Sequence, residues 1–302
     1  MTAAIVTDIL DALGVRPDRV LTLKDVQSGN SSWLVETHGG ALVVLRRYHD
    51  QATRDELGYE HAVLRHLSQL GWLVPVPESD LLRQDRRWFC LTRFVPGDAV
   101  TNCSVEQQRQ RGRALAQLHL ALRGLHLRIG QRHRWQPQHR GVTVHTNIEW
   151  EACLRNLSQA DPRLAAWAEK AAIDTHAALA AIGAHELPVD VVHGDFAEWN
   201  VHYQHGKLVG VIDFGLTHAD SRPYELAIAR TYRAPETISA YRDELTLHGW
   251  PLTPVEEAAI EPLHRAFRVD MAAWQVHHGQ RTGSYDLAMI ERQLARTGTS
   301  PP

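Results

Sequence analysis

The chain has 302 residues, a net charge of −3 and 44% hydrophobic residues. A chain of this length can form one large domain or two lobes, and it can bury a substantial core. The small negative net charge gives no argument for binding to nucleic acids or to anionic membranes, and the apolar runs are too interrupted to cross a bilayer. We therefore expect neither a nucleic acid nor a membrane as a partner.

The cellular setting is indicated by the N-terminus and by the cysteines. The first residues contain no basic segment followed by a long apolar stretch, so we expect no signal peptide. The three cysteines, Cys90, Cys103 and Cys153, are an odd set without metal-type spacing. A reduced, cytoplasmic protein is the simplest interpretation. The 19 histidines are scattered along the chain and predict no structural metal cluster.

The first part of the chain has the pattern of strands joined by turns. Gly39-Gly40 is a two-residue hairpin turn between two segments rich in β-branched residues. Pro96-Gly97 breaks the last of the strand patterns. The expected strands span residues 20–26, 33–38, 41–48 and 87–95.

A helix is expected between the third and fourth of these strands. Thr53 and Glu56 form a capping box at its start, and Gly71 ends it. Glu60 lies on the apolar face of this helix, where a carboxylate is costly unless a cation meets it. Arg46, at the end of an apolar strand segment, is the natural partner. The alternatives are that Glu60 lies at the solvated edge of the face and that Arg46 points to solvent.

After the Pro-Gly break the pattern becomes mainly helical. Capping boxes begin at Ser104 and Thr253, and Asp161 followed by Pro162 starts another helix. Pro262 should kink or break the long helix in which it falls. The expected helices span about 104–125, 147–157, 161–183, 235–248, 254–278 and 285–296.

Residues 126–146 have no regular pattern. The segment is rich in histidine and arginine and contains Pro137 and Gly141, and at about 20 residues it is long for a loop without a function. It can be a solvated surface segment, which is the interpretation we favour, or part of the wall of a substrate site. A basic and aromatic wall would suit a planar or anionic substrate. The C-terminal residues, 297–302, are expected to fray.

The densest chemical signal lies between residues 191 and 215. Alternating strand residues, a turn and an apolar return strand predict a hairpin, which brings Asp195 and Asn200 of one loop near Asp213. Carboxylates and an amide carbonyl are oxygen ligands that Mg²⁺ accepts while it keeps water and phosphate oxygens. A carboxylate left off the metal can take a proton from a hydroxyl, so these are the parts that phosphoryl transfer requires. Trp199 is expected to anchor the loop in the core.

These residues form one pattern, which reads His193-Gly194-Asp195…Asn200…Ile212-Asp213-Phe214. The pattern resembles the aminoglycoside phosphotransferase and homoserine kinase-like family, which shares the protein-kinase fold. The resemblance extends over about residues 23–227. It implies an α+β, bilobal fold, in which a small N-terminal antiparallel β-sheet lobe, residues 1–96, binds the nucleotide. A larger, mostly helical lobe, residues 97–302, would carry the catalytic residues and the acceptor site.

The resemblance implies a kinase that uses Mg²⁺ and ATP or GTP to phosphorylate a hydroxyl of a small molecule. Asp195 would accept the hydroxyl proton, and Asn200 and Asp213 would hold Mg²⁺. Arg46 stands where the family usually has a lysine; positioned by Glu60, it would hold the α- and β-phosphates. The other implied nucleotide-binding residues are Gly29, Ser31 and Ser32 in the turn over the phosphates, and Arg93, Phe94 and Val95 at the purine edge.

Other functions stay open at this point. Arginine in place of lysine, and Glu225 where the family usually has an aspartate, are clues to a non-catalytic nucleotide-binding regulator, although we expect Glu225 to be structural. A metal-dependent hydrolase is a further possibility, and His193 and Asp195 can merely brace a turn. For a kinase, the acceptor is an antibiotic or related natural product, which we favour, or a metabolite such as homoserine, choline or a sugar. A monomer and a homodimer are both compatible with the sequence.

Overall fold

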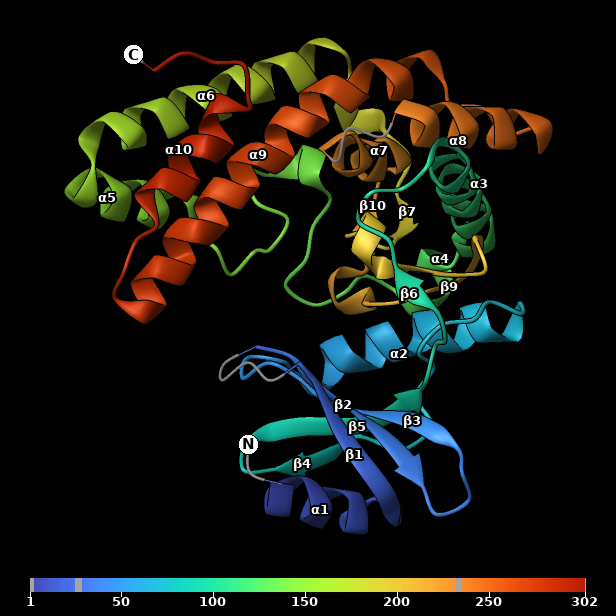
Figure 1. Cartoon of the computed structure of the whole chain (residues 1–302). Helices are drawn as coiled ribbons and strands as arrows, with labels where there is room; N and C mark the ends of the chain where they lie inside the picture. Colours follow the sequence, from blue (N-terminus) through green and yellow to red (C-terminus); the bar gives the residue numbers. More distant parts are fainter. Residues whose placement is uncertain (1–2, 25–28, 232–234, 302) are drawn as a thin grey trace. The chain divides into compact units, whose positions relative to one another are not determined.

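The structure is a computed structural model that describes residues 3–24, 29–231 and 235–301. The chain divides into two compact units. The first contains an antiparallel five-stranded sheet and the second is mostly helical, which confirms the expected α+β class (Figure 1). The first unit comprises Met1–Val100 and Trp199–Gly215, and the second comprises Thr101–Glu198 and Leu216–Pro302.

The hairpin that carries the expected metal ligands belongs to the first unit, whereas we expected a single lobe boundary after residue 96. β6 (Asp98–Ala99) pairs with β8 (Val201–Gln204), which turns into β9 (Lys207–Val211). The turn His205-Gly206 has φ values of +50° and +75°, the conformation that matches the twist of two adjacent strands. The predicted hairpin is therefore confirmed, and its pairing with β6 joins it to the N-terminal part of the chain.

The five-stranded sheet has the strand order β1-β2-β3-β5-β4. The turn Gly39-Gly40 is confirmed between β2 and β3, and Gly40 takes a φ of +76° that glycine adopts without strain. The first strand begins before the predicted residue 20, and the predicted residues 25–26 lie outside the described residues. The strands are β1 (Pro17–Lys24), β2 (Ser31–Thr37), β3 (Leu42–Arg47), β4 (Leu82–Gln84) and β5 (Arg87–Arg93).

The alternation of side chains along the strands gives this sheet two buried faces. Leu91 packs in a cluster with Ile9 and Leu10 of α1 (Ala3–Ala12), a helix that we did not predict. Its neighbour Cys90 packs with Leu57 of α2 (Arg54–Gln69). Successive residues of a strand point to opposite faces, so α1 and α2 contact opposite faces of the sheet.

The start and end of α2 agree with the sequence prediction. Glu56 N donates to Thr53 Oγ1, and Thr53 N donates to the Glu56 carboxylate at 3.1 Å, which confirms the capping box. Gly71, with a φ of +86°, follows the last turn. This start places Glu60, 1% exposed, on the face of α2 that packs against the sheet.

The second unit is built mainly from helices. The predicted N-caps at Ser104, Asp161 and Thr253 are confirmed, and β7 (Asp190–Val192) pairs antiparallel with β10 (His218–Asp220). Across the described ranges, none of the helices is long and apolar enough to cross a membrane. The helices are α3 (Val105–Leu122), α4 (His126–Ile129), α5 (Trp150–Ala160), α6 (Pro162–Ala181), α7 (Arg222–Thr231), α8 (Pro235–Leu247), α9 (Pro254–Thr282) and α10 (Leu287–Ala295).

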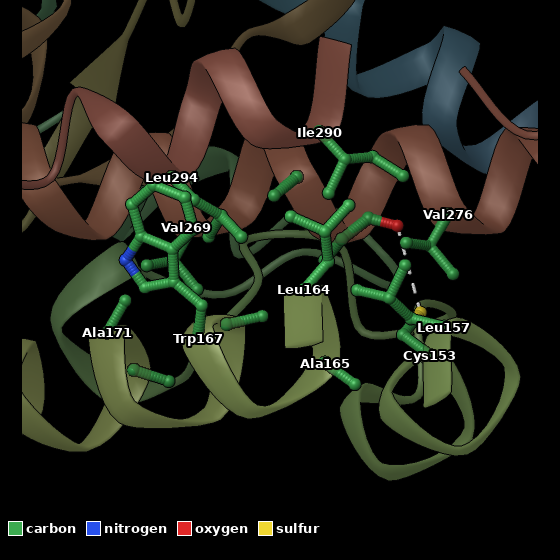
Figure 2. Close-up of a cluster of buried hydrophobic side chains, with 14 of the residues drawn as sticks. Cys153, Leu157, Leu164, Ala165, Trp167, Ala171, Val269, Val276, Ile290 and Leu294 are labelled. Atoms are coloured by element: carbon green, nitrogen blue, oxygen red, sulfur yellow. Dashed lines mark hydrogen bonds between the residues drawn. The ribbon is translucent and has the colours of Figure 1, made fainter. Parts of the chain in front are cut away.

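One large apolar cluster joins α5, α6, α9 and α10. Figure 2 shows Leu164 and Trp167 of α6 near Val269 of α9 and Ile290 of α10, and all four side chains are buried. The thiol of Cys153 in the same cluster donates to a backbone carbonyl of α9 at 3.7 Å and forms no disulfide. Burial of apolar surface therefore holds these four helices together.

Residues 126–146 do not form a solvated surface segment, so that expectation is wrong. Trp135 and Val144 are buried in a cluster with side chains of α7 and α9. Arg132 is 4% exposed, donates to the Thr217 carbonyl at 2.8 Å and lies 4.7 Å from the centroid of the Trp135 ring. The basic composition concealed this anchoring, because an arginine can bury its stem and stack on an aromatic ring.

The helix α9 continues through Pro262, so of the expected kink or break the structure excludes the break. Ala258, whose carbonyl would accept the helical bond that proline cannot donate, is exposed, so water can satisfy that carbonyl. The end of the chain does not fray through residue 299, because Thr297 is 1% exposed and Trp167 Nε1 donates to Thr299 Oγ1 at 2.9 Å.

The contact between α3 and α8 gives a stability prediction. A Cβ on Gly112 of α3 would collide with the backbone carbonyl of Thr237 in α8. We expect Gly112→Ala to lower the free energy of unfolding by about 1–3 kcal/mol, as overpacking typically does. Gly58→Ala is the matched control, because Gly58 is a helical glycine with open space around it, and alanine there should stabilise by about 0.5–1 kcal/mol. Urea denaturation measures both, and equal stabilities for the two variants would contradict the close contact.

Candidate nucleotide-binding and catalytic site

An arginine between two carboxylates lies at the centre of the first unit. Arg46 Nη1 donates to Glu60 Oε1 at 2.9 Å, and Nη2 donates to Asp213 Oδ1 at 3.3 Å. The Arg46 side chain is 11% exposed and that of Glu60 is 1% exposed. Burial alone would lower the pKa of Arg46, but Glu60, Tyr48 and Asp213 together outweigh burial and raise the pKa above its usual value. The expected pairing of Arg46 with Glu60 is therefore confirmed, and Arg46 stays charged.

The aromatic ring of Tyr48 lies against the guanidinium of Arg46. The guanidinium carbon of Arg46 lies 4.9 Å from the centroid of the Tyr48 ring, within the range of a cation–π contact. The Tyr48 hydroxyl shares a hydrogen bond of 2.8 Å with His61 Nε2. Both residues are at most 3% exposed. Burial, helped by Arg65 and Arg46, lowers the pKa of His61 to about 4, so this histidine is neutral at physiological pH.

The two expected metal ligands of the first unit occur at the same end of the β8–β9 hairpin. Ile212 N donates to the Asn200 carbonyl at 2.9 Å, so Asn200 is opposite the residue before Asp213. The Asp213 side chain is 46% exposed, and the backbone takes a φ of +59°. A left-handed conformation costs a non-glycine residue of the order of 1–3 kcal/mol and is often retained at functional sites.

Gly215 lies close to Arg46 and Asp213. A Cβ on Gly215 would lie 3.2 Å from Arg46 Nη2, 3.2 Å from Asp213 Oδ1 and 3.7 Å from Asn30 Nδ2. The absence of a side chain on this glycine thus lets its backbone lie beside a cation, a carboxylate oxygen and an amide nitrogen. A cationic donor beside a half-exposed carboxylate is a donor set that fits a phosphate oxygen together with Mg²⁺.

A pocket of about 240 Å³ opens in the first unit beside Arg46 and Asp213. Seven residues expected from the sequence line it, and Gly29, Glu60 and Asn200 do not. The expected loop residues 27 and 28 lie outside the described residues. The seven are Ser31, Ser32, Arg46, Arg93, Phe94, Val95 and Asp213, and they are joined by Leu23, Lys24, Asn30, Val44, Pro75, Thr92, His202 and Ile212.

Two of the pocket residues make contacts that the sequence did not reveal. Ser31 is 1% exposed, and its hydroxyl accepts from Arg47 Nη2 at 2.7 Å. His202 Nδ1 lies 3.1 Å from the Val95 carbonyl, so that carbonyl is already engaged by a side chain of the hairpin. No spacing signal pointed to His202, because its position depends on which strands pair.

The loop that carries Asp195 belongs to the second unit, and a buried carboxylate holds its backbone. Glu225, 0% exposed, accepts from His193 N at 2.9 Å and from Gly194 N at 2.8 Å. His119 Nε2 lies 3.0 Å from Glu225, and His119 Nδ1 lies 2.7 Å from the Tyr241 hydroxyl. Burial would raise the pKa of Glu225, but the hydrogen bonds and charge of His119 lower it overall. Glu225 is therefore structural, as expected.

The same loop is fixed by Gly194 and by one aromatic residue, Phe196. Gly194 has a φ of +85°, and a Cβ there would collide with the Leu216 carbonyl. Phe196 is fully buried, whereas Asp195 is partly exposed. Trp199 is 43% exposed, so the expectation that it anchors the loop in the core is wrong, and Phe196 has that role. An aspartate on an immobilised backbone and partly open to solvent suits a proton acceptor.

The fold and these residues define a kinase-like phosphotransferase. Residues 22–263 match the phosphotransferase enzyme family, and the chain belongs to that family. Homoserine kinase of Phenylobacterium zucineum (strain HLK1) is 28% identical over 305 residues, which cover 93% of this chain and 89% of that protein.

Solved structures share the fold. Amicoumacin kinase hAmiN, in complex with AMP-PNP, Ca²⁺ and Ami, matches with a TM-score of 0.70 and 16% identity, over 100% of this chain and 95% of that chain. Spectinomycin phosphotransferase APH(9)-Ia, in complex with ADP and spectinomycin, matches with a TM-score of 0.65 and 12% identity, over 99% and 95%. The expected kinase-like fold is therefore confirmed.

The Arg46–Glu60 pair gives a prediction for ligand binding. Glu60→Gln keeps the shape of the side chain but removes the negative charge that Glu60 places beside the buried guanidinium. We expect the affinity for a Mg²⁺-nucleotide to fall about tenfold and the free energy of unfolding to fall by about 1–3 kcal/mol, the cost of a lost charged hydrogen bond. Calorimetric titration and urea denaturation measure the two effects. Asp18→Asn, which removes an exposed carboxylate of the same unit, is the control, and unchanged affinity in Glu60→Gln would exclude Glu60 from the site.

The lowered pKa of His61 predicts how stability depends on pH. The folded chain keeps His61 neutral down to about pH 4, whereas the unfolded chain protonates it near pH 6.5. The unfolded state is therefore stabilised as the pH falls from about 6.5 to 4. The free energy of unfolding falls by up to about 3 kcal/mol over that range. His61→Gln should remove this part of the pH dependence. Denaturation curves at several pH values measure it, and parallel curves for the two proteins would refute it.

Proposed function

We propose that this chain transfers the γ-phosphoryl group of ATP or GTP, as the Mg²⁺ complex, to a hydroxyl of a small molecule. The observation that carries the proposal is the buried Arg46, which links Glu60 to the half-exposed Asp213 at the edge of a pocket. A guanidinium that stays charged can bind a phosphate group, and a carboxylate beside it that is still exposed to solvent can bind a metal ion. Phosphoryl transfer depends on such positioning and on electrostatic stabilisation.

In this proposal Arg46 binds the phosphates, and Asn200 and Asp213 hold Mg²⁺. The metal ion, when bound, neutralises charge that builds on the phosphate oxygens. Asp195, five residues before Asn200 in the chain, orients the acceptor hydroxyl and accepts its proton. The hydroxyl oxygen forms a bond to the γ-phosphorus as the bond from that phosphorus to the bridging oxygen breaks, and the nucleoside diphosphate leaves.

The base of the nucleotide has a proposed place at the end of β5. Arg93, Phe94 and Val95 line the pocket, and their backbone groups would meet the purine edge. Since His202 engages the Val95 carbonyl, the remaining backbone groups of this segment are the ones proposed for base contacts. Gly29, Ser31 and Ser32 would cover the phosphates, with the Ser31 hydroxyl already fixed by Arg47.

Two acceptor classes are candidates, each with its own observation. Similarity to a homoserine kinase along 93% of the chain favours homoserine or another small amino alcohol. The shared fold with kinases solved with amicoumacin-type or spectinomycin ligands favours an antibiotic or a related natural product. We propose nucleotide and a small-molecule acceptor as the partners. The three cysteines, free in the structure, are consistent with our proposal of a cytoplasmic setting.

A phosphorylation screen tests the function. The chain would be incubated with Mg²⁺-ATP or Mg²⁺-GTP and a panel of homoserine, choline, sugars, aminoglycosides, macrolides and spectinomycin, and products would be read as a mass gain of one phosphoryl group. We expect Asp195→Asn to lower kcat by a factor of about 100 or more with a modest change in KM, because general-base catalysis contributes about 10²–10⁴-fold. Asp213→Ala should abolish metal-dependent nucleotide binding.

The matched control for these variants is Asp243→Asn, which removes a carboxylate of α8 outside the proposed site. Hydrolysis of a phosphate ester without nucleotide would favour the hydrolase instead. Nucleotide binding without turnover on any acceptor would favour the regulator. A product that forms equally well in Asp195→Asn would refute the role of Asp195.

A further inference from the structure

The loop that carries Asp195 starts at the end of β7, and the residue before β10 holds that end in place. Val192, the last residue of β7, pairs with His218 of β10. The hydroxyl of Thr217 donates to the Val192 carbonyl at 2.6 Å, and both residues are fully buried. One side-chain hydrogen bond therefore connects the residue before β10 to the residue from which the loop leaves.

The same stretch of chain contacts the glycine of the loop. A Cβ on Gly194 would collide with the Leu216 carbonyl, so the loop backbone lies directly against this carbonyl. His218 Nδ1 lies 2.7 Å from the Leu216 carbonyl, and because a carbonyl oxygen only accepts, the nitrogen is the donor. Residues 216–218 thus support the loop at two points, in addition to the two amides that Glu225 binds.

A side chain from residues 126–146 fixes this support in turn. Arg132 Nη1 donates to the Thr217 carbonyl at 2.8 Å, although Arg132 is only 4% exposed. The centroid of the Trp135 ring lies 4.7 Å from the Arg132 guanidinium carbon and 5.0 Å from the centroid of the His218 ring. Burial of a guanidinium is costly unless such contacts offset it, so this one is held at a defined position against Thr217.

We propose that Arg132 is a positioning residue for Asp195, and that it acts through Thr217 on the backbone of the loop. The catalytic part of this inference rests on the proposed function. A proton acceptor serves a hydroxyl only within hydrogen-bonding distance, and a displacement of the order of 1 Å can lower the rate about 100-fold. Asp195 is partly exposed, so its position depends on a backbone that other residues must hold.

A purely structural role for Arg132 leads to a different expectation. Loss of its contacts would then lower the stability of the whole second unit, and backbone amides of the loop and of α3 would exchange hydrogen faster by the same factor. A positioning role affects the loop locally. The amides of His193 and Gly194, which donate to Glu225, would then lose more protection than those of α3.

Hydrogen exchange of the full chain, without a ligand, distinguishes the two roles. In Arg132→Met we expect the exchange rates of the His193 and Gly194 amides to rise about tenfold more than those of α3. Arg132→Lys, which keeps a charged donor, should restore most of the protection.

Thr217→Val tests the next contact in the chain of support. It keeps the shape of the side chain but removes the hydroxyl that Val192 accepts, so it should expose the same two amides. The double variant with Arg132→Met should show less than the product of the two effects, because both act through Thr217. If Arg132→Met does not fold, Thr217→Val makes the same comparison of the loop with α3.

Activity gives the second measurement. With an acceptor from the phosphorylation screen, Arg132→Met should lower kcat about tenfold and leave the KM for the nucleotide unchanged, because a displaced proton acceptor slows only the chemical step. Arg140→Met is the matched control, because Arg140 is an exposed arginine of the same segment; neither its exchange rates nor its kcat should change.

The inference is overturned if the amides of the loop and of α3 change by the same factor, or if the nucleotide KM rises while kcat stays constant. Absence of nucleotide binding by the unaltered chain would overturn the proposed function. The exchange experiment would still decide whether Arg132 holds the loop, so the two failures are distinguishable.

Discussion

The first unit depends on the charge of one buried guanidinium. Arg46 is 11% exposed, and an ion removed from water in this way is costly unless opposite charges and hydrogen bonds replace its hydration. Glu60 and Asp213 supply them at 2.9 and 3.3 Å. These partners come from α2 and from the residues that follow the hairpin, so the arginine of β3 connects three elements that are far apart in sequence.

The geometry of this contact explains why an arginine can stand where the family usually has a lysine. Nη1 meets one carboxylate, Nη2 meets the other, and the Tyr48 ring lies against the guanidinium. An ammonium group has no planar fork with which to make all three contacts. The replacement is therefore supported by its surroundings, and arginine at this position gives no argument for a non-catalytic regulator.

Local signals in the sequence predicted those parts of the structure that depend on neighbouring residues. The capping box of Thr53, the β8–β9 hairpin and the pairing of Glu60 with Arg46 follow from spacing within one or two elements. The burial of Trp135 and the contacts of His202 with the end of β5 depend on pairings between distant segments. A single sequence does not reveal which distant segments contact one another. The polar composition of residues 126–146 was therefore misinterpreted as exposure.

The second departure from the family pattern is supported in the same way as the first. Glu225 has a longer side chain than the usual aspartate, yet its two oxygens accept from the adjacent amides of His193 and Gly194. The longer carboxylate also meets His119, which Tyr241 fixes on its other side. A buried carboxylate with all these partners costs little, whereas one without them would be expelled or protonated. A substituted motif residue is therefore evidence of lost function only when its partners are lost as well, and here both replacements keep theirs.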